Sequence, residues 1–468
     1  MTEKKPLTVN DIRNIGEPTR MRIDLIPAPS TDCTVPLNLN QMRMSESHGD
    51  PRIGEESYSE LEAREFSLSD DGSVVLNKPR FHRDQLRPID WQYLEWLRKV
   101  CDQGEYRGDR TGTGTISLFG EVQMRVDLRV EFPALITKYV HFIAVDDELD
   151  WMKSGSTNIR SMKKNGTRIW DEWVIPGTEE YRMLTMDERV AKLSKEKQDD
   201  LESVEAMMRE DGRSYAQIQE VKCVHLERAG IPEKVLVAGE LGPVYGSQWR
   251  YWEDTRIIEA TEWQADPDGW QARGFTVVGK MYNGHQIVIN RKVDQIAKIE
   301  KAIRDEVLFQ QGKLEKHSAG RRIILSGWNV AMIEEMALPP CHTLAQWYVS
   351  SQTDEDGKHF LDCEMFQRSG DMFLGVPFNM AQYALFTCQL AHANGLRARY
   401  FTHTIGDAHI YSNHQDQVQE QLKRDPYKYA YPHLHISREV NSILELQTGD
   451  CKLMGYEHYP AIKAKVAV

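Results

Sequence analysis

The sequence of 468 residues lacks several features that would restrict what the protein does. It has no run of apolar residues long enough to span a membrane, and the segment from Met1 to Pro6 lacks the apolar character of a secretory signal. The seven cysteines are scattered and odd in number, and none forms a CxxC or a Cys/His metal spacing. We therefore expect free thiols in a reducing, cytoplasmic setting, no membrane partner and no bound metal.

Positively charged residues are also fewer than negatively charged ones. The chain carries 58 Lys and Arg against 71 Asp and Glu, which leaves a net charge of −13. Proteins that bind duplex DNA need a basic face, so we expect no direct DNA binding. A local group of arginines can still bind a small phosphorylated molecule. Apolar residues make up 40% of the chain, which is enough for a buried core.

The chain divides into an extension and a folded domain. Residues 1–85 are polar with little periodicity, so we expect an N-terminal extension that is partly disordered, for example over 45–56. Residues 86–468 are expected to fold together, with insertions at about 178–232 and 253–290. The first insertion is charged and has the spacing of helices packed on a surface. The second contains Asn283-Gly284 between two strand-like runs, which predicts a hairpin.

The rest of the domain mixes helical and strand patterns. Apolar residues at helical spacing predict helices, and alternating or compact apolar runs predict strands. The predicted helices cover 88–103, 140–153, 157–165, 292–309 and 378–395, and the predicted strands cover 116–130, 322–325 and 344–349.

Cys341 is the candidate nucleophile, in the run Leu338-Pro339-Pro340-Cys341-His342. A thiolate can add to an electron-poor ring carbon and leave later, provided that nearby cations lower the pKa of the thiol. The alternative is a buried structural cysteine, which describes most lone cysteines. Arginines would bind a phosphate through paired hydrogen bonds, and the alternative for them is a solvated surface position. The candidate phosphate ligands are Arg110, Arg321, Arg322, Arg368 and Ser369.

Other polar residues are candidates for reading a base or moving a proton. Asn379 has a carboxamide that can donate to one ring atom and accept from the next, although a helix N-cap is an equal alternative. Glu148 lies near aromatic residues and would act as a proton shuttle, against the alternative of an acidic helix face. His409 and Tyr411 lie in the run 406–414, where structural histidines are the alternative. A run of aromatic and acidic residues such as that from Trp170 to Trp173 more often lies in a hydrophobic core than in a functional site.

Taken together, these motifs resemble thymidylate synthase from about residue 88 to the last residue, with the two insertions set aside. The resemblance implies a mixed α/β fold with flanking helices around a mixed sheet, and a homodimer with a shared phosphate site. The matching stretches are 109–115, 132–138, 148–151, 157–159, 169–173, 241–246, 321–329, 337–342, 367–379, 406–414 and 455–468.

The resemblance also implies roles for the matching residues. Cys341 would attack C6 of dUMP, and Glu148, Tyr245 and His342 would form the proton-transfer and water network. The phosphate would be held by Arg110, Arg368 and Ser369, with Arg321 and Arg322 reaching the phosphate in the other subunit. Asn379 would read the pyrimidine edge and His409 and Tyr411 would hold the deoxyribose, while the substrate site would also include Gln367 and Asp371.

The implied co-substrate is 5,10-methylenetetrahydrofolate. Its pocket would be lined by Lys138, Trp170, Trp173, Asp371, Leu374, Gly375, Phe378 and Ala467.

The family has two outcomes, a methyl product formed with dihydrofolate and a 5-hydroxymethyl product formed with water. The polar run 149–154, Gln382 where a serine is usual and Glu364 where a glutamine is usual favour the hydroxymethyl product, as in phage enzymes that serve modified DNA. A phage origin would place the enzyme in the host cytoplasm. Trp170 and the complete C-terminal tail, which shield the one-carbon unit from water in methylating enzymes, favour thymidylate synthase as the alternative.

Two further points concern substrate choice and activity. Asn379 matches the enzymes that use dUMP, whereas the deoxycytidylate enzymes carry Asp there. An inactive nucleotide-binding family member is a second alternative. The intact set of Cys341, Arg368, Asn379 and His409 argues against it.

Overall fold

The computed structural model describes residues 66–68, 74–76, 86–282, 284–315 and 320–467. The chain divides into two units, residues 1–82 and 83–468. In the first unit, strands β1 (Phe66–Leu68) and β2 (Val74–Leu76) pair antiparallel. The disorder predicted for residues 45–56 lies outside the described residues.

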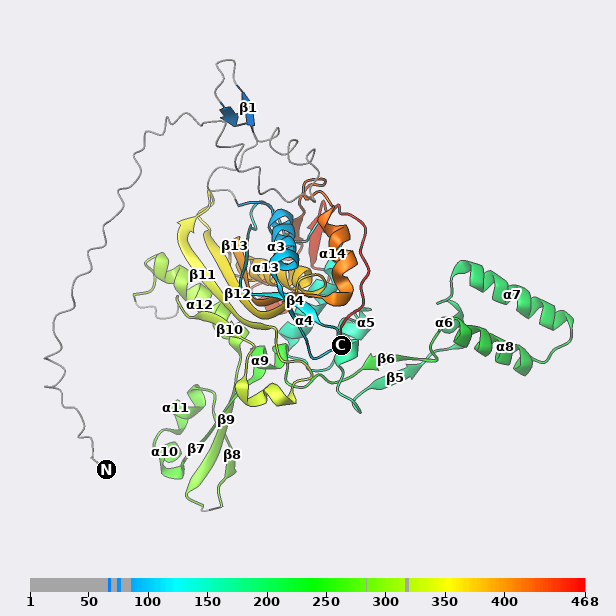
Figure 1. The fold of residues 1–468 in the computed structure, drawn as a ribbon. Helices are drawn as coiled ribbons and strands as arrows, with labels where there is room; N and C mark the ends of the chain where they lie inside the picture. The colour runs from blue at the N-terminus through cyan, green and yellow to red at the C-terminus, as the bar shows by residue number, and fades with distance from the viewer. Residues whose placement is uncertain (1–65, 69–73, 77–85, 283, 316–319, 468) are drawn as a thin grey trace, which may run out of the picture. The chain divides into compact units, whose positions relative to one another are not determined.

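A six-stranded mixed sheet forms the centre of the second unit (Figure 1). Strands β12 and β13 run parallel, and each of the other neighbouring pairs is antiparallel. This arrangement confirms the predicted α/β class with a mixed sheet. In spatial order the strands are β10 (Ile323–Ser326), β11 (His342–Thr353), β12 (His359–Asp371), β13 (Arg397–Tyr411), β4 (Thr115–Asp127) and β3 (Glu105–Arg107).

Helices cover one face of this sheet and bury the main core against it. The central helix α13 (Gly375–Ala393) packs on β12, β13 and α4 and is apolar almost all round, as expected for a buried helix. Shorter 3₁₀ turns and the hairpin of β14 (His433–Ile436) and β15 (Cys451–Met454) complete the layer. The other helices of the layer are α3 (Ile89–Gln103), α4 (Phe142–Ser154), α5 (Arg160–Lys164), α9 (Tyr245–Tyr251), α12 (Gln295–Gln310) and α14 (Gln415–Leu422).

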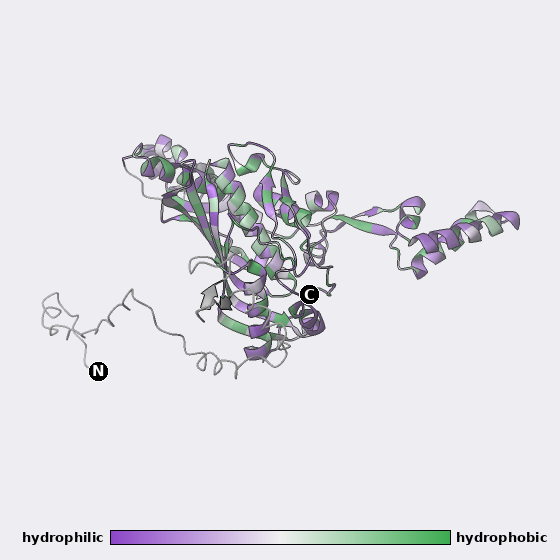
Figure 2. Cartoon of the chain, turned by 90° about the horizontal axis from the view of Figure 1, so that it is seen from above, coloured by the Kyte–Doolittle hydropathy of each residue, from purple (hydrophilic) through white to green (hydrophobic). Residues whose placement is uncertain are grey.

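The segment 178–232 contains the predicted helices, but they pack differently from the prediction. They bury Leu193, Leu201 and Leu226 against one another in a small core separate from the main one, and hydrophilic residues predominate along α7 and α8 (Figure 2). A two-stranded ribbon connects them to the domain. This ribbon was not predicted from the sequence. The elements are β5 (Glu180–Met183), α6 (Met186–Val190), α7 (Lys195–Glu210), α8 (Tyr215–Arg228) and β6 (Lys234–Ala238).

The segment 253–290 forms a three-stranded antiparallel sheet with its own small core of Trp270, Phe275, Ile287 and Ile289. Strands β8 and β9 pair as the predicted hairpin, with Val277 opposite Ile289, although Asn283 itself is outside the described residues. The elements are β7 (Trp252–Glu259), α10 (Ala260–Ala265), α11 (Pro267–Ala272), β8 (Thr276–Lys280) and β9 (Gln286–Val293).

Two further features concern the cysteines and the apolar character of the helices. The six cysteines among the described residues form no disulfide, as predicted. None of the described helices combines the length and the apolar character needed to cross a membrane.

Candidate active site

The register between β11 and β12 brings the Cys341 and Arg368 segments side by side. His342 lies opposite Gln367, and the Arg368 backbone N–H donates to the Cys341 carbonyl oxygen at 2.9 Å. The Arg368 guanidinium also donates to the carbonyl oxygens of Pro339 and Pro340, at 2.8 and 2.9 Å. Its Nη2 thereby lies 4.0 Å from the Cys341 Sγ. The proline pair thus fixes an arginine beside the thiol.

The electrostatics of Cys341 are set by two opposing effects. Burial raises the pKa of the Cys341 thiol above its usual 9.0, because the charged thiolate is poorly solvated, while the charge of Arg368 lowers it. Arg368 also lies 5.4 Å from the Trp328 ring as a cation–π pair. The thiol is therefore mainly protonated at neutral pH, and its activation requires a proton acceptor as well as Arg368.

Tyr245 and His342 surround the Cys341 backbone. The Tyr245 hydroxyl oxygen accepts from the Cys341 N–H at 2.8 Å, and the His342 ring lies between those of Tyr245 and Tyr383, at 5.3 and 5.1 Å. Burial lowers the pKa of His342 to about 4, so the ring is neutral at pH 7. Its Nδ1 has no hydrogen-bond partner within the described part of the chain. An uncharged ring with a free nitrogen suits a network that relays protons.

Glu148 has both carboxylate oxygens held by side chains. Trp170 Nε1 donates to Oε1 and Gln382 Nε2 donates to Oε2, each at 2.7 Å. Burial raises the pKa of Glu148 to about 7, although both hydrogen bonds favour the charged form. A carboxyl group that exchanges protons near pH 7 is suited to acid–base chemistry. The alternative of a solvated acidic helix face is wrong, because Glu148 is buried.

Asn379 lies inside helix α13 and is not its cap. The helix has Leu374 as N-cap residue, with no side-chain cap bond, so the capping alternative is wrong. The Asn379 Oδ1 accepts from Gln367 Nε2 at 3.0 Å, and that same Nε2 donates to the Ser369 carbonyl at 2.9 Å. The other end of the Gln367 amide contacts His403 Nε2 at 2.8 Å. Gln367, which is itself held by the Ser369 carbonyl and His403, therefore fixes the oxygen of the Asn379 carboxamide.

The segment after β12 is held by Asp371 and Lys138. Asp371 Oδ1 accepts from the backbone N–H groups of Phe373 and Leu374, at 2.9 and 3.2 Å. Although burial alone would raise it, the His414 ring, with Nδ1 3.9 Å from Asp371 Oδ1, keeps the pKa of Asp371 below its usual value. Lys138 is buried, with its Nζ against the Phe373 carbonyl and 3.9 Å from the Phe373 ring. Lys138 thus contacts Phe373, just before the start of α13.

The C-terminal tail runs along this same region. The His414 ring bonds the Lys465 carbonyl through Nε2 at 2.7 Å, and Arg424 donates to the Pro460 carbonyl at 2.7 Å. Ile462 and Ala464 pack on the core, and Ala467 is half-buried at the end of the described residues. Trp173, Leu374 and Phe378 are partly buried nearby in the same core cluster, and Gly375 begins α13.

His409 and Tyr411 lie at the end of β13, and their rings meet edge to face at 5.2 Å. Burial would lower the pKa of His409, but its bond to Asp407 and the charge of Asp371 raise it above its usual value. Burial, with smaller contributions from the charges of Asp371 and Asp109, raises the pKa of Tyr411 to about 12, while Arg110 lowers it. Arg110 itself is exposed in the loop before β4.

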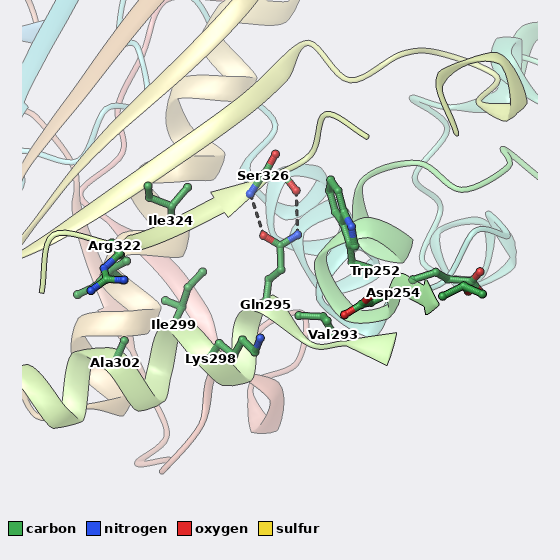
Figure 3. A pocket seen from close by; sticks show the side chains of 13 residues that line it. Trp252, Asp254, Val293, Gln295, Lys298, Ile299, Ala302, Arg322, Ile324 and Ser326 are labelled. Atoms are coloured by element: carbon green, nitrogen blue, oxygen red, sulfur yellow. Dashed lines mark hydrogen bonds between the residues drawn. The ribbon is translucent and has the colours of Figure 1, made fainter. Parts of the chain in front are cut away.

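Arg321 and Arg322 lie away from Cys341 within this chain. Both are exposed just before β10, and Ile323 pairs with Trp347, six residues beyond Cys341 on β11, or roughly 20 Å along the strand. Arg322 lines a groove of about 590 Å³ between β7, α12 and β10, in which Gln295 bonds both backbone groups of Ser326 at 2.9 and 3.0 Å (Figure 3). Within one chain, neither arginine joins the Cys341 site.

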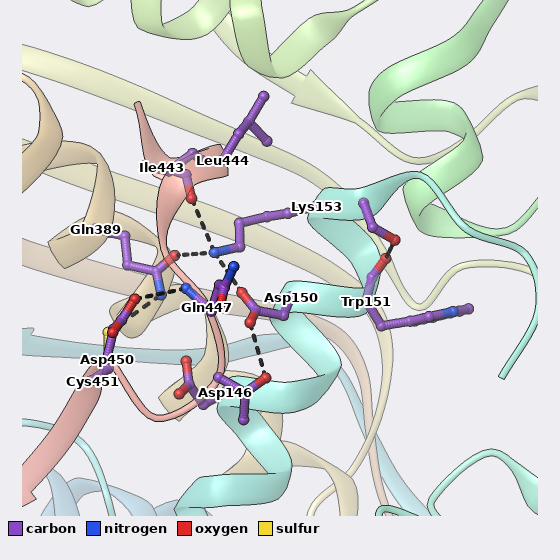
Figure 4. Close-up of polar contacts among 12 residues, drawn as sticks. Asp146, Asp150, Trp151, Lys153, Gln389, Ile443, Leu444, Gln447, Asp450 and Cys451 are labelled. Carbon is purple, nitrogen blue, oxygen red and sulfur yellow. Dashed lines mark hydrogen bonds and ion pairs between the residues drawn. The ribbon is translucent and has the colours of Figure 1, made fainter. Parts of the chain in front are cut away.

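The polar run on α4 faces away from Glu148. Lys153 is buried and pairs with Asp150 at 2.7 Å, and its Nζ also donates to Gln389 and to the Ile443 carbonyl (Figure 4). The second Asp150 oxygen accepts from the Thr448 hydroxyl at 2.9 Å. These contacts anchor the loop before β15, so the polarity of this helix reports on packing and carries no weight for the reaction product.

Several residues of the site were missed by the sequence reasoning. His403 and His414 orient Gln367 and Asp371, Tyr383 packs on His342, and Trp328 lies beside Arg368. Each acts through a partner distant in sequence, and the sequence contains no local signal for such a pair. Gln382 was noticed as unusual, but its bond to Glu148 was not predicted.

The comparison with known families gives one finding. The family model described as thymidylate synthase matches residues 91–468.

Proposed function

Because the chain belongs to the thymidylate synthase family, we propose that Cys341 adds to C6 of dUMP and that the enzyme transfers a one-carbon unit to C5, giving 5-hydroxymethyl-dUMP. Members of the family are one-carbon transferases that use methylenetetrahydrofolate, in general with dUMP as the acceptor. The observation that carries the proposal is Cys341 beside Arg368, with the polar groups of Glu148, Tyr245, His342 and Asn379 around it.

The residues present fit both ligands. The Arg368 guanidinium, with Ser369 next to it, suits a phosphate. The described hydrogen bonds to Asp371 end on Oδ1, which leaves Oδ2 to accept from a ligand N–H, and Trp173 and Phe378 are only partly buried. When bound there, methylenetetrahydrofolate supplies the one-carbon unit. Asp371, Trp173 and Phe378 would hold it.

With both ligands bound, the residues of this chain would carry out the following steps. The Cys341 sulfur bonds to C6, electron density moves to O4, and the proton network at Glu148 supplies a proton there. C5 becomes nucleophilic and bonds to the one-carbon unit, its hydrogen leaves to water as a proton, and the bond that joined the unit to tetrahydrofolate breaks, which leaves an exocyclic methylene group on C5. Water then bonds to the new carbon, the Cys341–C6 bond breaks and the C5–C6 double bond re-forms. The carbon keeps its oxidation level, so no hydride is needed.

One-carbon transfer at C5 is tested by dUMP that carries tritium at C5. Incubation with enzyme and methylenetetrahydrofolate should release tritium to water, because the C5–H bond breaks whichever product forms. If the folded protein leaves the tritium on dUMP after an incubation long enough for many turnovers, the inactive nucleotide-binding alternative is favoured.

The choice of base rests on the orientation of Asn379. The Ser369 carbonyl can only accept, so Gln367 must direct its Nε2 toward it and donate to Asn379 Oδ1. The Asn379 amide hydrogens are therefore left for the ligand. They suit the O4 carbonyl of uracil and clash with the amino group of cytosine, which favours dUMP over dCMP.

We predict that Asn379→Asp shifts the preference from dUMP toward dCMP. A carboxylate accepts from the cytosine amino group but repels the uracil carbonyl, and one such paired contact changes discrimination by about 1–3 kcal/mol. The ratio of kcat/KM for the two nucleotides measures the shift. An unchanged ratio would show that Asn379 does not read the base.

The hydroxymethyl product is favoured by Gln382, whose polar side chain lies against Glu148. Thymidylate synthase activity, with dihydrofolate as the second product, is the alternative. The observations that favour this alternative are Trp170 at Glu148 and the tail docked on His414.

We also propose a homodimer formed through the uncovered face of the six-stranded sheet. Ile324, Leu344, Phe366 and Tyr348 project from this face and are 37, 38, 41 and 54% exposed, and the β-register places Leu344 opposite Phe366. An apolar patch of neighbouring side chains on one sheet face indicates an interface. Arg321 and Arg322 lie beside it, where they would reach the other subunit's phosphate.

Tyr348→Asp should dissociate this dimer, because it buries a charge at the centre of the interface. Sedimentation velocity should show a monomer near the mass of one chain. Tyr282→Asp is the matched control, since Tyr282 is fully exposed in the turn between β8 and β9 and its replacement should leave the dimer intact. A Tyr348→Asp protein that sediments like the parent would exclude this face.

A further inference from the structure

Gln382 is a buried carboxamide that contacts the proton-exchanging group of the site. It is 1% exposed and lies three residues after Asn379 on α13, on the same side of the helix. Its Nε2 donates to Glu148 Oε2 while Trp170 donates to Oε1, so the carboxylate is fixed from two sides. Neither donor lies on α4, the helix that carries Glu148.

The other end of the same side chain is unpaired. Gln382 Oε1 is buried and has no hydrogen-bond partner among the residues that the structure describes. The amide must direct its nitrogen to the carboxylate, so the oxygen does not bond Glu148 and is left to accept from another donor. Buried acceptors in native proteins bind a donor, and where no protein donor is near that donor is a water or a ligand.

We propose that Gln382 is a positioning residue that holds Glu148 through its amide nitrogen and, through its free carbonyl oxygen, holds the water that adds to the one-carbon unit. This inference rests on the proposed function and specifies how the hydroxymethyl product arises. A serine at this position could not make both contacts, because it is too short to reach across from α13 to Glu148 while keeping an acceptor free.

The charges around Glu148 are consistent with this role. Burial raises the pKa of Glu148 to about 7, the bonds from Trp170 and Gln382 lower it, and Asp147 on the same helix raises it. Tyr245 on α9 and Tyr383 on α13 face the same group and stay protonated at neutral pH, because burial raises the pKa of each hydroxyl well above 10. Removal of the Gln382 donor therefore shifts Glu148 further toward its protonated form.

The step balances without a further reactant. A lone pair of the water oxygen forms the bond to the one-carbon unit, the π electron pair between that carbon and C5 moves to re-form the C5–C6 double bond, and the Cys341 sulfur leaves C6 with the electron pair of the C6–S bond. Glu148 has by then given up its proton toward O4, so it is charged and accepts the proton of the water, and the bond from Gln382 favours this charged form. Nothing is oxidised or reduced in this step.

The test compares Gln382→Met, which keeps the volume and removes both polar contacts, with the parent enzyme. We expect the pH–rate limb assigned to Glu148 to move above 7. We also expect the ratio of hydroxymethyl-dUMP to thymidylate to fall at least tenfold. Gln421→Met is the matched control, because Gln421 is also fully buried with one donated bond and an unpaired Oε1, but contacts Thr137. It should leave both readouts unchanged.

The following outcomes decide whether Gln382 positions Glu148 and holds the water. If Gln382→Met folds and keeps the parental pH limb and product ratio, the positioning role is wrong. If it does not fold, Gln382→Ser, the smaller residue, is measured in the same way. If the parent enzyme itself makes only thymidylate with dihydrofolate, the proposed product is wrong and the water-holding role fails with it. The pH limb of Gln382→Met then still decides whether Gln382 positions Glu148.

Discussion

Replacement of Cys341 by serine should lower kcat by about a thousandfold or more, while dUMP still binds. The hydroxyl cannot form the thiolate adduct at C6, but Arg368 and Asn379 still hold the phosphate and the base. Product formation and dUMP binding, measured by calorimetry on the same protein, separate the two effects. The backbone bond from residue 341 to Tyr245 is retained, so no loss of stability is expected.

Cys223→Ser is the control for this variant. Cys223 lies on α8 in the separate helical segment, and its replacement should leave kcat unchanged. A Cys341→Ser enzyme that turns over at the parental rate would show that no sulfur adduct forms at this residue.

Glu148→Gln should lower kcat by about 10² to 10⁴-fold, the range expected for loss of a general acid or base. The pKa of Glu148, raised by burial from 4.5 to about 7, leaves the group protonated below pH 7 and ionised above it. Addition of Cys341 to C6 needs a proton donor toward O4. The parental kcat/KM should therefore fall as the pH rises through about 7, and the variant should lack this limb.

Glu131→Gln is the matched control, because Glu131 is also buried and burial raises its pKa to about 8. Glu131 bonds the Ile89 backbone at the start of α3, away from Cys341, and its replacement should leave the alkaline limb in place. If Glu148→Gln keeps the limb near pH 7, another group must be responsible for it.

The elements that the sequence predicted well are those with a local pattern. The helices around 88–103 and 378–395 have regular apolar spacing, and Asn283-Gly284 predicted the β8–β9 hairpin from two residues. The short ribbon of β5 and β6 was missed because its strands are mostly exposed and show no alternation.

Within the candidate site, the sequence predicted which residues to consider but not which side chains contact them. Cys341 and Arg368 were found as motif residues, and their proximity depends on the β11–β12 register. The contact of Gln382 with Glu148 joins residues 234 positions apart, which no local pattern reveals. The Asp150–Lys153 pair was predictable as an i, i+3 contact, but its burial under the 443–449 loop was not, so the polar helix was misread as evidence for the product.

The most direct measurement is a single reaction of the enzyme with dUMP and methylenetetrahydrofolate, in which the nucleotide is identified by mass and dihydrofolate is followed by absorbance. We predict 5-hydroxymethyl-dUMP as the main product, with at most a minor amount of dihydrofolate, because water held at Gln382 and Glu148 takes the place of hydride. Thymidylate formed together with an equal amount of dihydrofolate would contradict it.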